Sequence, residues 1–207
     1  MTLTLTIAIL IITCIISITA FNNHKVINDL IFSPIEVQRK NQWYRFITCG
    51  FIHADFAHLA FNMIGLYFFG RVMEQVYIEA FDLPKYTYLL LYVSAIIISE
   101  IPSYIKHRNN SQYRSLGASG GVAAIVFSYI LLAPWATIYV FLIPIPAIVY
   151  GVLFLVYSAY MDRKGGGNVN HSAHFWGAMV GVVFTIVVQP KMVDIFIQQL
   201  LHPSFNF

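Results

Sequence analysis

The sequence predicts an all-α integral membrane protein, built as a bundle of six transmembrane helices. Of its 207 residues, 58% are hydrophobic and only 10% are charged, far less charge than a soluble domain carries. The apolar residues gather in runs close to the length of about 20 residues that a helix needs to cross a bilayer. A segment in lipid must satisfy its backbone internally, so each run is predicted to be a helix. The net charge of +3 is too small and scattered to indicate a nucleic-acid partner.

Six apolar runs follow one another along the chain. The first is about 20 residues long, with no Lys or Arg ahead of it, which suits a spanning helix better than a signal peptide. The stretch 116–161 is more than twice the length of one span, and Pro134, Pro144 and Pro146 divide it because proline lacks a backbone donor. The predicted spans are 3–21, 56–69, 86–104, 119–133, 147–161 and 173–188.

The connections between the runs are polar. The interval 22–55 is too long for a turn, so it is either a functional loop or holds short interfacial helices. The segment 162–170, DRKGGGNVN, is predicted to be a flexible loop. Without an internal repeat, the whole chain 1–207 is expected to form a single polytopic domain with a short C-terminal tail, 189–207. The two cysteines, Cys14 and Cys49, are too few for a disulfide framework and are expected to be structural.

Six spans place three polar helix starts on one side of the membrane. Alternate spans run in the same direction, so the second, fourth and sixth all begin on the same face. His58, Ser119 and His174 lie near these three starts. The count alone therefore predicts that these side chains share one end of the bundle.

Ser119 lies in the segment RSLGASGGVAAIVF, between Gly117 and Gly120. Small residues at a helix start let backbones approach closely and leave the first N–H groups accessible beside the positive end of the helix dipole. A serine nucleophile there would have part of its oxyanion site already built. The alternative is an ordinary serine N-cap at a helix-packing site.

His174 precedes Gly177 and Gly181, whose spacing of four residues creates a small face along the sixth span. Packing this face against the start of the fourth span would bring the imidazole within reach of Ser119 as a general base. The alternative is a histidine that only caps its helix.

His58 and Asn62 are four residues apart, so they share one face of the second span. Both side chains are donors that could stabilise the negative oxygen of a tetrahedral intermediate. The alternative role is interhelical hydrogen bonding. A metal site is a further alternative, since five imidazole and carboxylate groups gather on this side, although no His-Glu-x-x-His helix is present. These groups are His53, Asp55, His58, His171 and His174.

Together these motifs resemble the rhomboid family of intramembrane serine proteases. The resemblance covers about 42–188. It rests on Trp43-Tyr44-Arg45, His53, His58-Leu59-Ala60-Phe61-Asn62-Met63, Gly70-Arg71 with Glu74, Gly117-Ala118-Ser119-Gly120, and Ala173-His174 with Gly177 and Gly181.

The resemblance implies a six-helix rhomboid-like bundle with a Ser119/His174 dyad that acts through an acyl-enzyme. His58, Asn62 and the backbone N–H of Ser119 would stabilise the oxyanion, with Gly117, Gly120, Gly177 and Gly181 as structural support. Arg45 and Glu74 would brace the loop after the first helix, and that loop would lie partly in the membrane. The fifth helix and the loop 162–170 would form a mobile gate.

The implied substrates are other membrane proteins whose transmembrane helices are destabilised near one face of the bilayer, cut after a small residue. No cofactor is expected. A non-catalytic relative that binds membrane helices without cutting them is the alternative. The family's usual bacterial arrangement places the protein in the inner or plasma membrane with the active site outward. That arrangement puts nine Lys and Arg residues outside and three, Arg71, Lys85 and Lys191, inside, against the positive-inside rule.

One position departs from the family pattern. Family members often carry an aromatic residue four positions after the nucleophile, packed on the histidine, and here that position is Ala123. Either another residue, Phe127 or Trp176, then orients His174, or the ring is held more loosely.

Overall fold

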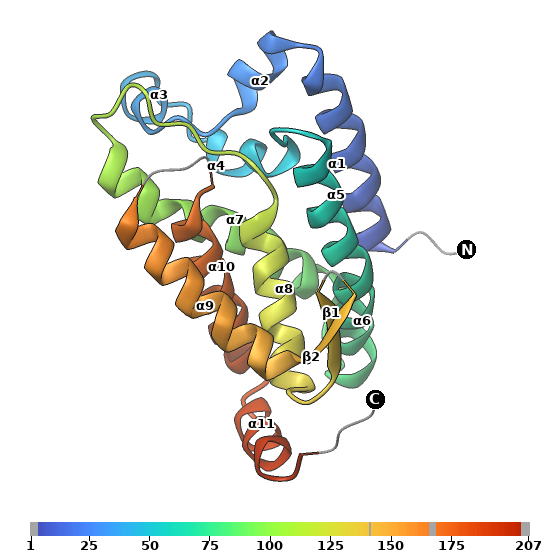
Figure 1. Cartoon of the computed structure of the whole chain (residues 1–207). Helices are drawn as coiled ribbons and strands as arrows, with labels where there is room; N and C mark the ends of the chain where they lie inside the picture. Colours follow the sequence, from blue (N-terminus) through green and yellow to red (C-terminus); the bar gives the residue numbers. More distant parts are fainter. Residues whose placement is uncertain (1–3, 141, 166–168, 204–207) are drawn as a thin grey trace.

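The computed structural model describes residues 4–140, 142–165 and 169–203, and is mostly helical (Figure 1). The predicted start of the first span at Leu3 and the middle of the predicted loop 162–170 lie outside these residues. The six predicted runs each form a helix. Their bounds are α1 (Leu5–Phe21), the continuous helix Phe56–Ala80, α7 (Lys85–His107), α8 (Ser119–Leu132), α9 (Ala147–Lys164) and α10 (His171–Val188).

Three of these helices are long and apolar enough to cross a membrane: Phe56–Ala80, α7 and α10. Two further apolar helices among the six are shorter: α1 has 17 residues and α8 has 14. The second helix does not end at residue 69 as predicted. It continues through Arg71 to Ala80, as α5 (Phe56–Gly65), η2 (Leu66–Gly70), α6 (Arg71–Gln75) and η3 (Val76–Ala80), of which η2 and η3 are π-helical. Arg71 therefore lies within a helix, where its guanidinium donates to the Tyr67 hydroxyl at 2.9 Å.

Two expectations about the connections are corrected. The segment 134–146 is not only a proline break, since it forms an antiparallel hairpin of β1 (Thr137–Val140) and β2 (Ile143–Pro146), with Thr137 opposite Pro146. The fold is mostly helical, with this hairpin as an addition to the predicted helices. The tail also contains a helix, α11 (Met192–Leu201). The long interval 22–55 holds the short helices α2 (His24–Leu30), α3 (Pro34–Lys40), α4 (Arg45–Thr48) and η1 (Cys49–Phe51), one of the two forms considered.

The core of the bundle is α10, which packs along both α7 and α8. Glycines allow this packing. A Cβ at Gly177 would lie 2.7 Å from the Cα of Gly120, and one at Gly181 would lie 2.6 Å from the Cα of Ala124. Since no side chain fits in these positions, the backbones of α8 and α10 are in direct contact, as the small face predicted. Figure 1 shows that α5, α8 and α10 begin toward the same upper end of the molecule.

Polar side chains hold the opposite end of the bundle. The Thr185 hydroxyl is hydrogen-bonded to the hydroxyls of Tyr77 at 2.8 Å and Ser128 at 2.6 Å, which joins η3, α8 and α10. The Glu74 carboxylate accepts from the backbone N–H groups of Leu5 at 2.7 Å and Thr6 at 2.8 Å. It therefore caps α1, whose first N–H groups have no acceptor within the helix.

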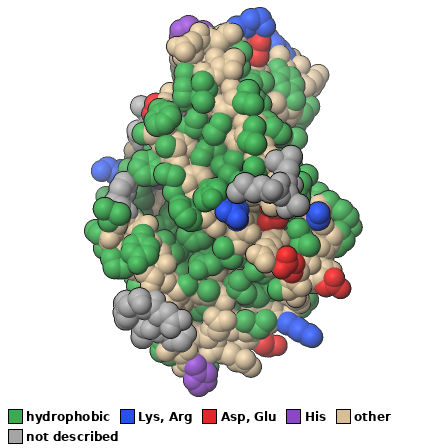
Figure 2. Space-filling model, turned by 90° about the vertical axis from the view of Figure 1, so that its right-hand side faces the viewer, with side chains coloured by type: hydrophobic (Ala, Val, Ile, Leu, Met, Phe, Trp, Pro, Cys, Tyr) green, Lys and Arg blue, Asp and Glu red, His purple; other side chains and the backbone are tan. Residues whose placement is uncertain are grey.

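The surface on the α1 and α5 side is largely hydrophobic (Figure 2). Isoleucines of α1 and aromatic residues of α5 are among the exposed hydrophobic residues of the chain. An apolar surface offers the contact that lipid requires. The exposed residues include Ile11, Ile15, Ile18, Phe56 and Phe61.

Candidate active site

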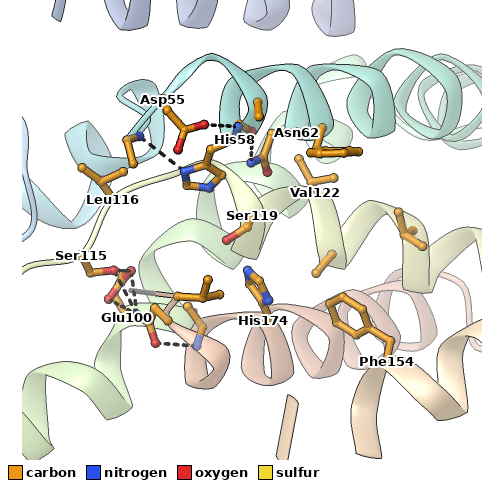
Figure 3. Close-up of a pocket in the computed structure, with 18 of the residues that line it drawn as sticks. Asp55, His58, Asn62, Glu100, Ser115, Leu116, Ser119, Val122, Phe154 and His174 are labelled. Carbon is orange, nitrogen blue, oxygen red and sulfur yellow. Dashed lines mark hydrogen bonds between the residues drawn. The ribbon is translucent and has the colours of Figure 1, made fainter. Parts of the chain in front are cut away.

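A cavity of about 540 Å³ lies at the end of the bundle where α5, α8 and α10 begin (Figure 3). Its lining includes all four side chains with predicted chemistry: Ser119, His174, His58 and Asn62. The cavity has a polar end at Glu100, Ser115 and Asn170. Its other end is apolar, formed by residues that include Val126, Phe127, Tyr150 and Phe154.

Ser119 is the first residue of α8, so its backbone N–H has no acceptor within the helix. The turn before it depends on Gly117, whose φ of +118° favours glycine. Gly117 donates to the carbonyl of Cys49 at 2.9 Å, which anchors the turn to η1. Figure 3 shows Ser119 and His174 facing the same space. Among the described residues, no hydrogen bond yet joins the two side chains; such contacts often tighten only with substrate.

His53 anchors the same turn through a hydrogen bond to its backbone. Its Nε2 accepts from the backbone N–H of Ala118 at 3.3 Å, so the neutral ring carries its proton on Nδ1 and donates it to Ser17 Oγ at 2.9 Å. The Ser17 hydroxyl in turn donates to the carbonyl of Phe51 at 2.8 Å. Burial, with a smaller contribution from His58, lowers the pKa of His53 from 6.5 to about 3, and keeps the ring neutral.

His58 and Asn62 present donors to the cavity. The Nδ1 of His58 accepts from the N–H of Ala54 at 3.4 Å, which leaves the ring proton on Nε2. A Cβ at Gly117 would lie 2.8 Å from this Nε2, so the donor lies beside the turn that carries Ser119. The Asn62 amide donates one hydrogen to the His58 carbonyl at 2.9 Å, which leaves its second hydrogen for another acceptor.

The ring of Phe154 on α9 stacks on His174, with centroids 5.8 Å apart and planes inclined by 25°. The two residues that the sequence suggested do not do this. Phe127 contacts Phe154 at 5.6 Å instead, and Trp176 is 44% exposed, because the side of α10 that carries it faces outward. No sequence signal identifies Phe154, since its position depends on the rotation of α9 within the bundle.

Glu100, like Phe154, is a residue of the site that the sequence analysis did not identify. Its carboxylate is 5% exposed and accepts from the Ser115 hydroxyl at 2.8 Å and from the Asn170 amide at 3.1 Å. The Oδ1 of Asn170 caps α10 by accepting from the N–H of Ala173 at 3.1 Å. Glu100 thus links the segment before Ser119 to the start of the helix that carries His174. A lone carboxylate within an apolar run was the available signal.

The two predicted braces lie in different places. Arg45 donates to the carbonyls of Asn28 at 2.8 Å and Ile31 at 2.6 Å, so it joins α4 to the end of α2 within the interval 22–55. Glu74 does not brace that interval. It caps the start of α1 at the opposite end of the bundle, because the helix Phe56–Ala80 continues well beyond the site before it reaches Glu74.

The groups proposed as metal ligands do not come together as a set. Within the described part of the chain, no three His, Cys, Asp or Glu side chains are placed to hold one ion. Asp55 instead caps α5, where its carboxylate accepts from the N–H of His58 at 2.8 Å. His171 and His174 pack edge to face, with ring centroids 5.8 Å apart.

Fold and site together define a class of protein. It is a helical membrane protein that holds a serine, a histidine and amide donors around a cavity at one end of its bundle. The Rhomboid domain family matches residues 40–191. This chain belongs to the rhomboid family.

Several curated proteins share this similarity. The chain is 32% identical over 173 residues to "RHOMBOID-like protein 12, mitochondrial" of Arabidopsis thaliana, covering 79% of this chain and 51% of that protein. It is 25% identical over 150 residues to "Putative rhomboid protease YdcA" of Bacillus subtilis, covering 72% and 69%. A shorter match of 83 residues, 34% identical, joins it to "Rhomboid protease GluP" of the same bacterium, covering 40% and 14%. The chain thus spans about half the length of the Arabidopsis relative.

Proposed function

We propose that the chain is an intramembrane serine endopeptidase with Ser119 as nucleophile and His174 as general base. The observation that carries this proposal is the convergence of both side chains on one cavity, beside the donors of His58 and Asn62. The printed names of two relatives, YdcA and GluP, contain the word protease, which supports the same assignment.

The proposed reaction follows from these positions. Ser119 Oγ attacks the carbonyl carbon of the scissile peptide while His174 takes the hydroxyl proton. The resulting oxyanion receives hydrogen bonds from the backbone N–H of Ser119, Nε2–H of His58 and the free amide hydrogen of Asn62. His174 then gives its proton to the leaving amine. A water molecule, deprotonated by His174, hydrolyses the acyl-enzyme and regenerates Ser119.

The proposed substrates are transmembrane segments of other membrane proteins. A helix in lipid shields its amides by internal hydrogen bonds, so cleavage needs an unwound segment and a cavity that admits water. Segments weakened near one interface by glycine, proline or polar residues meet this requirement. We further propose that α1, Phe56–Ala80, α7, α8, α9 and α10 all span the membrane, as one polytopic domain. We place the site on the outer face of a bacterial-type plasma membrane.

Cleavage of a membrane-helix reporter by the purified chain in liposomes tests this function. The wild type is expected to cut the reporter, while Ser119→Ala and His174→Ala each lose at least about 100-fold of the rate. Ser111→Ala and His24→Ala, at exposed positions, serve as matched controls and should keep full activity. Full cleavage by Ser119→Ala would refute the proposal. Helix binding without cleavage by folded wild type would favour the non-catalytic alternative.

A further inference from the structure

The His174 ring is oriented by packing alone. In the described parts of the chain, no hydrogen bond to either ring nitrogen is found. Its neighbours are the stacked ring of Phe154 and the edge-on ring of His171, both with centroids 5.8 Å away. A general base must present one nitrogen to the serine, and a ring without a hydrogen-bonded partner needs another constraint on its rotation. The flat contact with Phe154 supplies such a constraint.

Phe154 is itself held by aromatic neighbours. Its centroid lies 5.6 Å from Phe127 on α8 and 5.7 Å from Tyr150 on α9. Ala123, one turn after Ser119, lies in the same apolar cluster and lines the same cavity. Its methyl group leaves space on the α8 side that a larger side chain would fill. The aromatic surface on His174 therefore comes from α9 and not from α8.

The helix that carries Phe154 is the least buried of those around the site. Only three of its 18 residues are buried, Ala147, Gly151 and Ser158, and all are small. Outward residues such as Val152, Leu153 and Val156 are more than half exposed. Phe154 is thus a large side chain on the inner face of a helix whose other large contacts with the bundle come from partly buried residues, among them Ile148, Tyr150 and Leu155.

We infer that Phe154 is the positioning residue for His174, so that the base takes its working orientation only while α9 lies against α10. This inference rests on the proposed function for its effect on rate. Movement of α9 away from the bundle removes the ring from His174, so the base is correctly oriented only while the cavity wall is closed. Phe154 does not contact the reacting atoms, and its expected effect is on kcat more than on KM.

Three variants test the inference by activity. Phe154→Leu removes the flat ring but keeps most of the volume, and should lower kcat about 10-fold with KM within about two-fold, a loss of about 1.4 kcal/mol in transition-state stabilisation. Phe154→Tyr keeps the ring and should retain activity. Adding Ala123→Phe to Phe154→Leu returns an aromatic ring from α8 and should recover most of kcat. Tyr160→Leu, at an exposed position on α9, is the matched control.

A second readout does not depend on cleavage. A phenyl ring stacked on an imidazole shifts the imidazole proton resonances, so histidine-labelled protein reports the contact by NMR, with His174→Gln as the assignment control. Phe154→Leu should move the His174 resonances and Tyr160→Leu should not. Unchanged resonances, or an unchanged kcat in active protein, would overturn the inference. A wild type that shows the ring shift but cuts no reporter would overturn the proposed function and leave the packing role supported.

Discussion

Two of the helices that pack on α10, α8 and α9, are packed in opposite ways. On one side, α8 has ten buried residues among 14, and its backbone touches α10 directly at Gly120 and Ala124. On the other side, α9 has three buried residues among 18, and contacts the site through Tyr150 and Phe154. Close packing resists displacement, whereas a helix with few buried contacts moves at lower cost. The proposed nucleophile, Ser119, thus lies on the rigid side, and α9, on the looser side, forms one wall of the cavity.

The strongest test of this comparison makes the same substitution on both sides. Gly181→Ala places a Cβ 2.6 Å from the Cα of Ala124, so the backbones of α8 and α10 must separate. The expected cost is about 1–3 kcal/mol or more, with loss of reporter cleavage. Gly151→Ala on α9 meets side chains and no backbone, the end of Ile130 at 3.0 Å and the Phe127 ring at 3.5 Å. It should be nearly neutral, since alanine also favours the helix by about 1 kcal/mol.

Thermal unfolding of both glycine variants in detergent, with cleavage measured in parallel, decides the point. If Gly181→Ala were as stable and as active as Gly151→Ala, the contrast between the two sides would be wrong.

The next largest effect is expected at Glu100, whose carboxylate links the segment before α8 to the start of α10. Glu100→Leu removes the buried acceptor of the Ser115 hydroxyl, at about 1–3 kcal/mol. It also removes one acceptor of the Asn170 amide, which keeps its contacts with the Ser103 and Ser115 hydroxyls. We expect about a 10-fold fall in kcat, because the segments before Ser119 and His174 lose their common anchor. Glu100→Gln keeps one acceptor oxygen, so its kcat should lie between those of Glu100→Leu and the wild type.

The control for the Glu100 variants is Glu79→Gln, which changes an exposed carboxylate that accepts a hydrogen bond from Gln75. Equal kcat in Glu100→Leu and Glu79→Gln would show that the link has no effect on the site.

The last expected effect concerns the turn before Ser119. It is the smallest at neutral pH and grows below pH 6.5. His53 is neutral in the folded protein because burial lowers its pKa to about 3, whereas the unfolded value is near 6.5. The unfolded state therefore binds the extra proton first. Stability is complete above pH 6.5 and falls by up to about 1.4 kcal/mol per pH unit as the pH drops toward 3.

Thermal midpoints of the wild type and of His53→Gln, measured between pH 7.5 and 4.5, check this expectation. Other groups titrate in both proteins, so the difference between the two curves reports His53. The wild type should lose stability more steeply below pH 6.5. Parallel curves for the two proteins would contradict the neutral, buried state of His53.

Patterns along the chain predicted the helices and the residues around the cavity more reliably than the contacts between them. Run length and proline positions indicate where helices form, and the alternation of direction places His58, Ser119 and His174 at one end. The hairpin at 137–146 was missed because apolar β-branched residues beside prolines suit both a helix break and a strand. The end of the second helix was misplaced because Arg71 and Glu74, both charged, interrupt its apolar run.

The roles of individual side chains depended on distances that no pattern contains. Glu74 was expected near the loop after α1, yet the length of its helix carries it to the other end of the bundle. Phe127 on α8 and Phe154 on α9 are equally apolar, and the packing of the two helices decides that Phe154 is the one stacked on His174. The carboxylate of Glu100 was visible in the sequence, but its partners come from segments 15 and 70 residues away.

The central claim is that Ser119, on the rigid side, is a nucleophile activated by His174. Reaction of the purified full chain with a fluorophosphonate, followed by mass spectrometry of the adduct, tests it most directly. The account predicts one adduct per chain, on Ser119, that is absent in Ser119→Ala and forms at least about 100-fold more slowly in His174→Ala. Folded wild-type protein that stays unlabelled, or that carries its adduct on another serine, would contradict it.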